Sequence, residues 1–275
     1  MNLNGKVISF LNQKGGVGKT TMAFNTAHAL SKQGHRVLCI DMDPQGNLSL
    51  LFNREVKDDY HIHHLLVNSL RELKSIHSPV IYTDVLNSIG PIDLLAAGPE
   101  LSGFELTVAG ISSPRQLILK KFIENNALTN IYDYIVIDGP PTLGLLVVNI
   151  LCASDGLLIP FKADDFSKKG LLSFYEVLDQ IKDMGISKVP DVIGHIPNLL
   201  DKKRKQEQSD LKSIKLNQKD DVKYFGPFYN KAQLVKSLGH RKSVFEFSLK
   251  EFNEIQGQFK AIAQGIEEWN HGQIQ

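Results

Sequence analysis

Short apolar runs and longer amphipathic stretches alternate along the chain. We predict buried strands at 7–11, 35–41, 92–95, 134–138, 156–160 and 192–196. We predict helices at 22–33, 115–126, 143–152, 168–184 and 249–269. Strands that alternate with helices are typical of parallel sheets, because each parallel pair needs a helical crossover. The pattern therefore predicts an α/β fold: a doubly wound, mostly parallel sheet with helices on both faces.

The pattern is less informative in one region and leaves the strand order open. Residues 52–88 contain apolar positions without a clean period, so no element is assigned there. The sequence shows no internal repeat, low-complexity tract or long linker. A length of 275 residues suits one large domain, and we predict a single domain over 1–275. Crossovers between parallel strands should be right-handed.

Composition adds a few exclusions. The chain has no run of about 18 apolar residues, so we expect no transmembrane helix. Residues 1–6 are polar and lead straight into the first strand, which leaves no room for a signal peptide. Cys39 and Cys152 lie in apolar segments and should be buried thiols in a reducing cytoplasm. We interpret the histidines at 61, 63 and 64 as surface or loop residues, because no zinc-ligand spacing accompanies them.

Charge is unevenly distributed. The net charge is only +1. Residues 201–245 contain 12 Lys or Arg and 5 Asp or Glu, a local balance of +7. A basic segment on an otherwise acidic protein suits a binding surface, and it also suits an ordinary solvated one.

The residues between the first strand and the first helix have the composition of a phosphate-binding loop. They read Asn12-Gln13-Lys14-Gly15-Gly16-Val17-Gly18-Lys19-Thr20-Thr21. Glycines let backbone N–H groups curl around an anion, and the following helix directs its N-terminal dipole at the same place. Lys19 would reach the β- and γ-phosphates of a nucleotide, and the Thr20 hydroxyl would bind Mg²⁺.

Two acidic motifs follow at the ends of predicted strands. Asp41 and Asp43 follow the second strand, and two carboxylates at this spacing can serve a metal ion and a water together. Asp138 ends the strand at 134–138 and precedes two prolines; this is the Walker B arrangement for holding Mg²⁺. In open parallel sheets the carboxyl ends of the strands form one edge, so all three motifs should meet there.

The glycine loop reads K-G-G-V-G-K-T from Lys14, and this string resembles the deviant P-loop of the ParA/MinD family of ATPases. The motifs D-x-D-P-Q-G-N at Asp41 and D-x-P-P at Asp138 are also similar, and the resemblance extends from about Gly5 to Glu268. It implies an ATP- and Mg²⁺-dependent ATPase of the short, Soj-like ParA type. It implies that Lys14 crosses a dimer interface to the partner's nucleotide, that Asp43 activates water, and that Asp41 supports Mg²⁺.

The implied site residues fall into three groups. The catalytic residues are Lys14, Lys19 and Asp43, and the metal ligands are Thr20, Asp41 and Asp138. The nucleotide-binding residues are Lys14, Gly15, Gly16, Val17, Gly18, Lys19, Thr20, Thr21, Asn198 and Pro227. Asn198 and Pro227 match family positions near adenine. Phe228 and Tyr229 replace the family's Arg and Asn, so the match is loose there.

On this scaffold we expect a partition ATPase. The resemblance implies an ATP-bound homodimer that binds duplex DNA without sequence preference, a ParB-like partner that triggers hydrolysis, and a cytoplasmic, nucleoid-associated protein. Phosphate contacts need only basic side chains. The expected DNA-binding residues are Lys202, Lys203, Arg204, Lys205, Lys231, Lys236, Arg241 and Lys242.

Other functions on the same scaffold remain open. A MinD-like membrane-positioned regulator needs a basic amphipathic C-terminal helix, but acidic residues outnumber basic ones in 249–269. We therefore expect no stable membrane association and interpret that helix as packed on the sheet. An iron–sulfur electron donor needs cluster cysteines, and Cys39 and Cys152 lie in core-like positions. A protein assembly rather than a plasmid or chromosome could be the cargo.

Overall fold

The computed structural model describes residues 5–54, 61–71, 86–112, 114–185, 188–216 and 222–273. The strands are β1 (Lys6–Phe10), β2 (Val37–Asp41), β3 (Asn87–Ile89), β4 (Ile92–Leu95), β5 (Tyr134–Asp138), β6 (Gly156–Phe161), β7 (Asp191–Pro197) and β8 (Lys223–Tyr224). The helices are α1 (Lys19–Lys32), α2 (Asn47–Leu51), α3 (Ile62–Arg71), α5 (Phe104–Thr107), α6 (Ile118–Asn125), α7 (Leu128–Ile131), α8 (Leu145–Ala153), α9 (Asp165–Asp183), α10 (Lys205–Leu216), α11 (Ala232–Gly239) and α12 (Asn253–Gly272).

The described strands form one sheet in the order β3-β4-β2-β5-β1-β6-β7-β8. All neighbours pair in parallel except β3, which forms an antiparallel hairpin with β4. The strand order changes direction at β1, which lies between β5 and β6. This topology confirms the predicted doubly wound, mostly parallel sheet.

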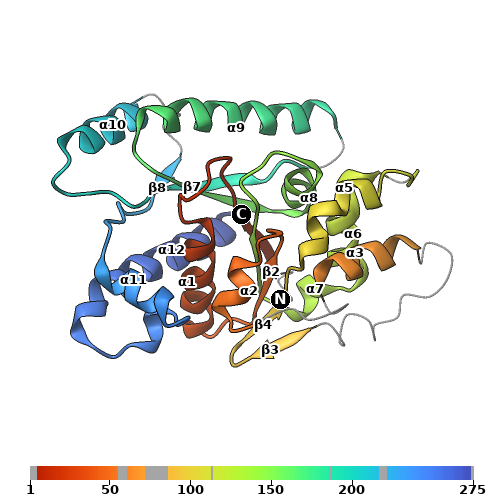
Figure 1. The fold of residues 1–275 in the computed structure, drawn as a ribbon, viewed down its shortest axis with the longest axis horizontal. Coiled ribbons are helices and arrows are strands. Elements are labelled where there is room, and N and C mark those ends of the chain that lie inside the picture. Colours follow the sequence, from red (N-terminus) through yellow and green to blue (C-terminus); the bar gives the residue numbers. More distant parts are fainter. Residues whose placement is uncertain are drawn as a thin grey trace.

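The alternation of side chains along each strand divides the core into two layers. In β5, Ile135 and Ile137 join one buried cluster, while Tyr134 and Val136 join the other. The first cluster receives apolar residues from α3, α6, α8 and α9, and the second from α1, α2, α11 and α12. Figure 1 shows α1, α2, α11 and α12 grouped together, away from α3, α5, α6 and α7. Both faces of the sheet are therefore covered by helices.

The structure confirms the strands and helices expected from the pattern, with bounds that differ by a few residues. It adds β3, β8, the short helices α2, α5 and α7, and the helices α10 and α11, which the pattern did not predict. Of these, α10 lies in the basic segment and has few apolar residues to mark a helical face. Part of the unassigned stretch 52–88 forms α3, while residues 55–60 and 72–85 lie outside the described residues.

The apolar stripe of α12 packs into the core. Ile255, Phe259, Ile262 and Ile266 are each at most 1% exposed, in the same cluster as α1. This confirms the interpretation of α12 as a packed helix. Among the described residues, no helix combines the length and apolar character that a membrane crossing requires.

The prediction for the histidines was wrong for His63, which lies in α3 and is 8% exposed. His61 lies in the loop before α3, as predicted, but is only 1% exposed, and His64 is partly exposed on α3. The ring of His61 lies against Gly98, where a Cβ would be 2.5 Å from it, and His61 Nε2 lies 2.9 Å from a carboxylate oxygen of Glu100. A missing side chain and an acidic neighbour make this burial possible, and neither signal is visible in local periodicity. The prediction that Cys39 and Cys152 are buried thiols is confirmed.

Candidate nucleotide-binding site

The three motifs meet at the carboxyl ends of adjacent strands. The glycine loop follows β1, and the acidic motifs follow β2 and β5. Because β5 lies between β2 and β1, Asp138 is paired in register with Asp41 on one side and with Phe10 on the other. The sheet topology therefore places both carboxylates beside the glycine loop.

The glycine loop has a conformation that demands glycine. Gly16 and Gly18 have φ angles of 68° and 91°, in the left-handed region that side chains disfavour. A Cβ on Gly18 would also lie 2.3 Å from Nδ2 of Asn198, and that nitrogen donates a 2.8 Å hydrogen bond to the Val17 carbonyl. Since α1 begins at Lys19, this loop delivers the N-terminus of α1 to the sheet edge.

A cavity of about 410 Å³ opens over this loop. Its lining residues are Gly15, Gly16, Gly18, Lys19, Thr20, Thr21, Asp43, Gln45, Asn47, Leu50, Leu51, Pro141 and Leu238. Lys19 is 7% exposed, and its Nζ lies 3.5 Å from the Lys14 carbonyl. Burial lowers the pKa of Lys19, while the nearby charges of Asp138 and Asp43 oppose that shift. A buried ammonium between acidic groups, at a helix N-terminus, suits the binding of a phosphate chain.

Asp138 carries the signature of a cation site. The residue is fully buried, and neither carboxylate oxygen has a well-formed hydrogen bond among the described residues. Burial and the charge of Asp41 raise its pKa well above the usual value, while the Thr20 side chain and Lys19 favour the charged form. A buried carboxylate with free lone pairs is costly unless a cation compensates it. The oxygen donors of Asp138 and Thr20 are those that Mg²⁺ prefers, so the residues fit this ion.

Asp41 is already occupied by hydrogen bonds. One oxygen accepts from the Ser49 backbone at 2.8 Å and from the Ser49 hydroxyl at 2.7 Å, and the other accepts from the Asp43 backbone at 3.2 Å. Burial raises its pKa to about 6 against these bonds. In this arrangement Asp41 fixes the Asp43 loop and the start of α2, so support for Mg²⁺ would pass through water. The spacing of the motif did not reveal Ser49, which also accepts a 2.9 Å bond from the Ala97 backbone.

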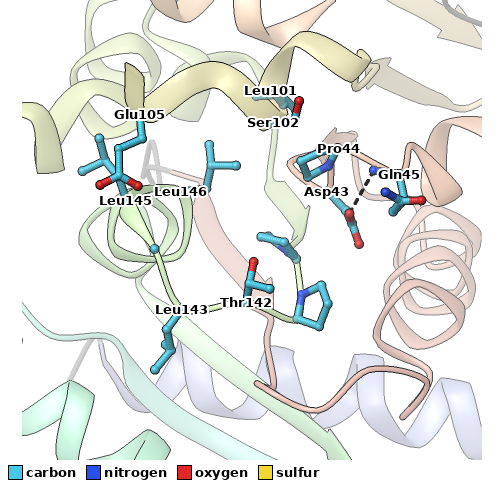
Figure 2. Close-up of a pocket in the computed structure, with 13 residues that line it drawn as sticks. Asp43, Pro44, Gln45, Leu101, Ser102, Glu105, Thr142, Leu143, Leu145 and Leu146 are labelled. Carbon is cyan, nitrogen blue, oxygen red and sulfur yellow. Dashed lines mark hydrogen bonds between the residues drawn. The ribbon is translucent and has the colours of Figure 1, made fainter. Parts of the chain in front are cut away.

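Asp43 lies between two cavities. Its Oδ1 accepts a 3.0 Å hydrogen bond from the Gln45 backbone, and the residue is 7% exposed. Figure 2 shows its carboxylate directed into the space beside Gln45, opposite the loop that contains Thr142. A neighbouring cavity of about 410 Å³ extends from Asp43 toward Glu105 and the start of α8. This position suits a group that orients a water molecule at the end of a phosphate chain.

Lys14 forms an ion pair that the sequence did not predict. Its ammonium contacts the carboxylate of Asp164, and both side chains are 37% exposed. Asp164 is also the N-cap of α9, because its Oδ1 accepts from the Ser167 backbone at 3.0 Å. Burial opposes the charge of Asp164, but the hydrogen bonds from Lys14 and Ser167 outweigh it and lower its pKa. The N-cap role of Asp164 could have been found in the sequence, because an aspartate just before a helix is a typical N-cap residue.

The two expected adenine contacts lie in different settings. Asn198 is 1% exposed and stabilises the glycine loop through its hydrogen bond to the Val17 carbonyl. Pro227 is half-buried, and its carbonyl accepts a 2.9 Å hydrogen bond from Gln258. Phe228 is fully buried against Phe259 on α12. The departure from the family at this position therefore serves core packing, and contact of Asn198 and Pro227 with adenine stays a prediction.

The basic residues gather from separate segments. An isolated parallel bridge between Leu200 and Tyr229 brings two loops together. As a result Lys202, Lys203, Arg204 and Lys231 line one cavity of about 510 Å³. Lys205 begins α10, Lys236 lies on α11, and Arg241 and Lys242 follow α11. We call these eight residues together the basic surface.

Comparison with known proteins agrees with this geometry. The family model described as an AAA domain matches residues 5–189. The sporulation initiation inhibitor protein Soj of Bacillus subtilis is 39% identical over 61% of this chain and 62% of its own length. The chromosome partitioning protein ParA of Caulobacter vibrioides is 29% identical over 79% of this chain and 78% of its own length. The chain spans 53% of the length of two Mycobacterium tuberculosis relatives that are 38% identical to it.

A solved structure shows the same fold. The ATP complex of a point variant of Cyanothece McdA superposes with a TM-score of 0.82, covers 96% of this chain and 97% of its own, and is 22% identical. An identity this low supports the fold alone, whereas the domain match over residues 5–189 includes the three motifs of the site. The chain therefore belongs to the ParA/MinD-type family of P-loop ATPases.

Proposed function

We propose that the protein is an ATP-dependent partition ATPase of the cytoplasm and nucleoid. Its ATP-bound homodimer binds duplex DNA without sequence preference, and a ParB-like partner stimulates hydrolysis to segregate plasmid or chromosomal DNA. The observation that carries the ATPase part is the convergence of Lys19, Thr20, Asp43 and the unsatisfied carboxylate of Asp138 at the glycine loop.

Each of these residues has a chemical role in the proposal. Backbone N–H groups of the loop and the Lys19 ammonium bind the phosphates of ATP. Asp43 orients the attacking water and accepts its proton. Thr20 and Asp138 would hold Mg²⁺, with Asp41 supporting it through water, and the ion would supply charge neutralisation of the phosphates.

Dimerisation rests on Lys14. This residue is 37% exposed at the entrance of the loop, and its present partner Asp164 belongs to the same chain. Two triphosphates buried at one interface need cations from both subunits, because an uncompensated buried charge is strongly destabilising. A second Lys14 from the other subunit provides such a cation.

DNA binding rests on the basic surface. Lys and Arg contacts to phosphates carry no base specificity, which suits a non-specific track. Two basic surfaces in one dimer double the contacts on a duplex, so the dimer should bind far more tightly than the monomer.

The Asp43→Ala variant tests the proposal. It should retain ATP but fail to hydrolyse it, so sedimentation with ATP should show twice the monomer mass. A monomer at micromolar concentration would contradict the sandwich. Mobility shifts of this variant on unrelated duplexes at two salt concentrations test whether the dimer binds DNA without sequence preference. If the dimer forms but does not bind DNA at low salt, the protein more plainly suits a positioning ATPase that binds a protein scaffold in place of DNA.

A further inference from the structure

The basic surface is not uniformly available to a polyanion. Arg204 lies 3.7 Å from Asp201 and 3.3 Å from Glu207. Lys202 lies over the Tyr229 ring, 4.7 Å from its centroid. Lys203, Lys205, Arg241 and Lys242 form no ion pair with the described part of the chain.

Two further lysines are paired with acids in the first turn of α12 and in the turn just before it. Lys231 Nζ lies 2.6 Å from Oε1 of Glu254, and the Lys231 side chain is only 15% exposed. Lys236 Nζ lies 3.7 Å from Oε1 of Glu251, with both side chains about half exposed. The hydrogen bond and charge of Lys231, together with the charge of Lys202, lower the pKa of Glu254. Glu254 therefore remains ionised beside the cavity that Lys202, Lys203 and Lys231 share.

We propose that Glu254 is an internal competitor of DNA phosphate: it occupies Lys231 and thereby limits the affinity of the basic surface for polyanions. The inference rests on the proposed DNA-binding function and names its regulation. A lysine whose charge is already compensated by a carboxylate of its own chain neutralises little phosphate charge. It therefore displaces few counterions from the DNA and adds little to affinity or to salt dependence. The free lysines Lys203 and Lys205 then supply the main contacts of the loop before α10. The more distant pair of Glu251 and Lys236 acts in the same direction, more weakly.

This competition sets an upper limit on the affinity of the protein for DNA. Each additional neutralised phosphate steepens the log–log salt slope by about 0.9, which at 0.1 M salt is roughly an eightfold gain in affinity. Because Glu254 is paired with Lys231, the protein does not obtain this gain in affinity. A moving ATPase must release its track quickly, and weaker contacts dissociate faster.

The test compares two Glu→Gln substitutions on α12, made in the Asp43→Ala protein loaded with ATP. Glu254→Gln frees Lys231. The matched control, Glu268→Gln, breaks another glutamate–lysine pair of α12, with Lys223, 2.7 Å apart and outside the basic surface. Both variants remove one negative charge, so any difference between them is local. Glu254→Gln should steepen the salt slope for duplex DNA by about 0.9 per contacting subunit and Glu268→Gln should not.

A double-mutant cycle assigns the gain to Lys231. Lys231→Gln should reduce the slope less in the Glu254 background than in the Glu254→Gln background, where it should cancel the whole gain. Lys203→Gln should reduce the slope in either background. Equal slopes for the two glutamate variants, or a loss from Lys231→Gln as large as that from Lys203→Gln, would overturn the inference.

A second probe separates this inference from the proposed function. The salt at which each variant elutes from immobilised heparin reports polyanion binding without any role for DNA. A shift specific to Glu254→Gln on heparin, with no duplex binding by any variant, would uphold the competition and reject the DNA track. Identical elution of both glutamate variants would reject the competition itself.

Discussion

The nucleotide-binding edge of the sheet and the basic surface differ in how their residues come together. At the sheet edge, the glycine loop is contiguous in sequence, and Asp41 and Asp138 are aligned by strand register. The basic surface depends on a bridge between Leu200 and Tyr229 and on acids from α12 that neutralise part of it. A site built from one loop and two strand ends tolerates little change. On a charged surface built from several loops, each single substitution should remove only a fraction of the binding affinity.

The largest effect should come from removing the main phosphate cation. Lys19→Ala leaves the anion-binding loop without its buried ammonium, so ATP affinity should fall by about 100-fold or more. Nucleotide-binding titration and phosphate release measure this. Undiminished turnover in the variant would reject the assignment of the site.

Replacing a glycine whose backbone conformation disfavours other residues, in the same loop, should reduce stability and ATP binding nearly as much. Gly18→Ala forces a side chain into the left-handed region at a cost of about 1–2 kcal/mol, and its Cβ would collide with Asn198. Thermal unfolding should show a lower Tm and ATP binding should weaken. Gly15→Ala is the matched stability control, because a Cβ there meets nothing within 4 Å. An equal loss of Tm in both variants would show that the collision is irrelevant.

Asp138→Asn should separate stability from function. It removes a buried carboxylate whose charge burial and Asp41 disfavour, so without Mg²⁺ the variant should be more stable than the wild type, while hydrolysis is lost. Because the folded pKa of Asp138 is raised, the wild type loses stability as pH rises through that pKa. The difference in Tm should therefore be larger at pH 8 than at pH 5, by about 2–4 °C for each kcal/mol. A constant difference across this range would contradict a raised pKa.

The smallest effect should come from a single cation of the basic surface. Lys203→Glu should weaken binding to every duplex alike, by roughly tenfold at 0.1 M salt, and should leave ATP binding unchanged. Mobility shifts on two unrelated sequences and a nucleotide titration measure the two properties. A sequence-dependent loss would indicate base contacts and contradict a non-specific track.

The contrast between the regions also explains what the sequence could predict. Apolar runs predicted the central strands, and motif spacing predicted the cluster at Lys19 and Asp138, because both signals are local. The pairing of Lys14 with Asp164 and of Lys231 with Glu254 joins residues that are distant in sequence. The burial of His61 depends on a glycine in another segment. Such partners follow from tertiary contacts, which periodicity and charge counts do not contain.

The packing of α12 against α1 has a consequence for synthesis on the ribosome. The helix that carries Lys19 shares its buried cluster with Ile255, Phe259 and Ile262, which are translated more than 200 residues later. At 5–20 residues per second, α1 waits for about 10–40 s before this part of its core exists. During that interval the apolar face of α1 lacks its native cover, so the nascent chain would be a substrate for chaperones until α12 emerges.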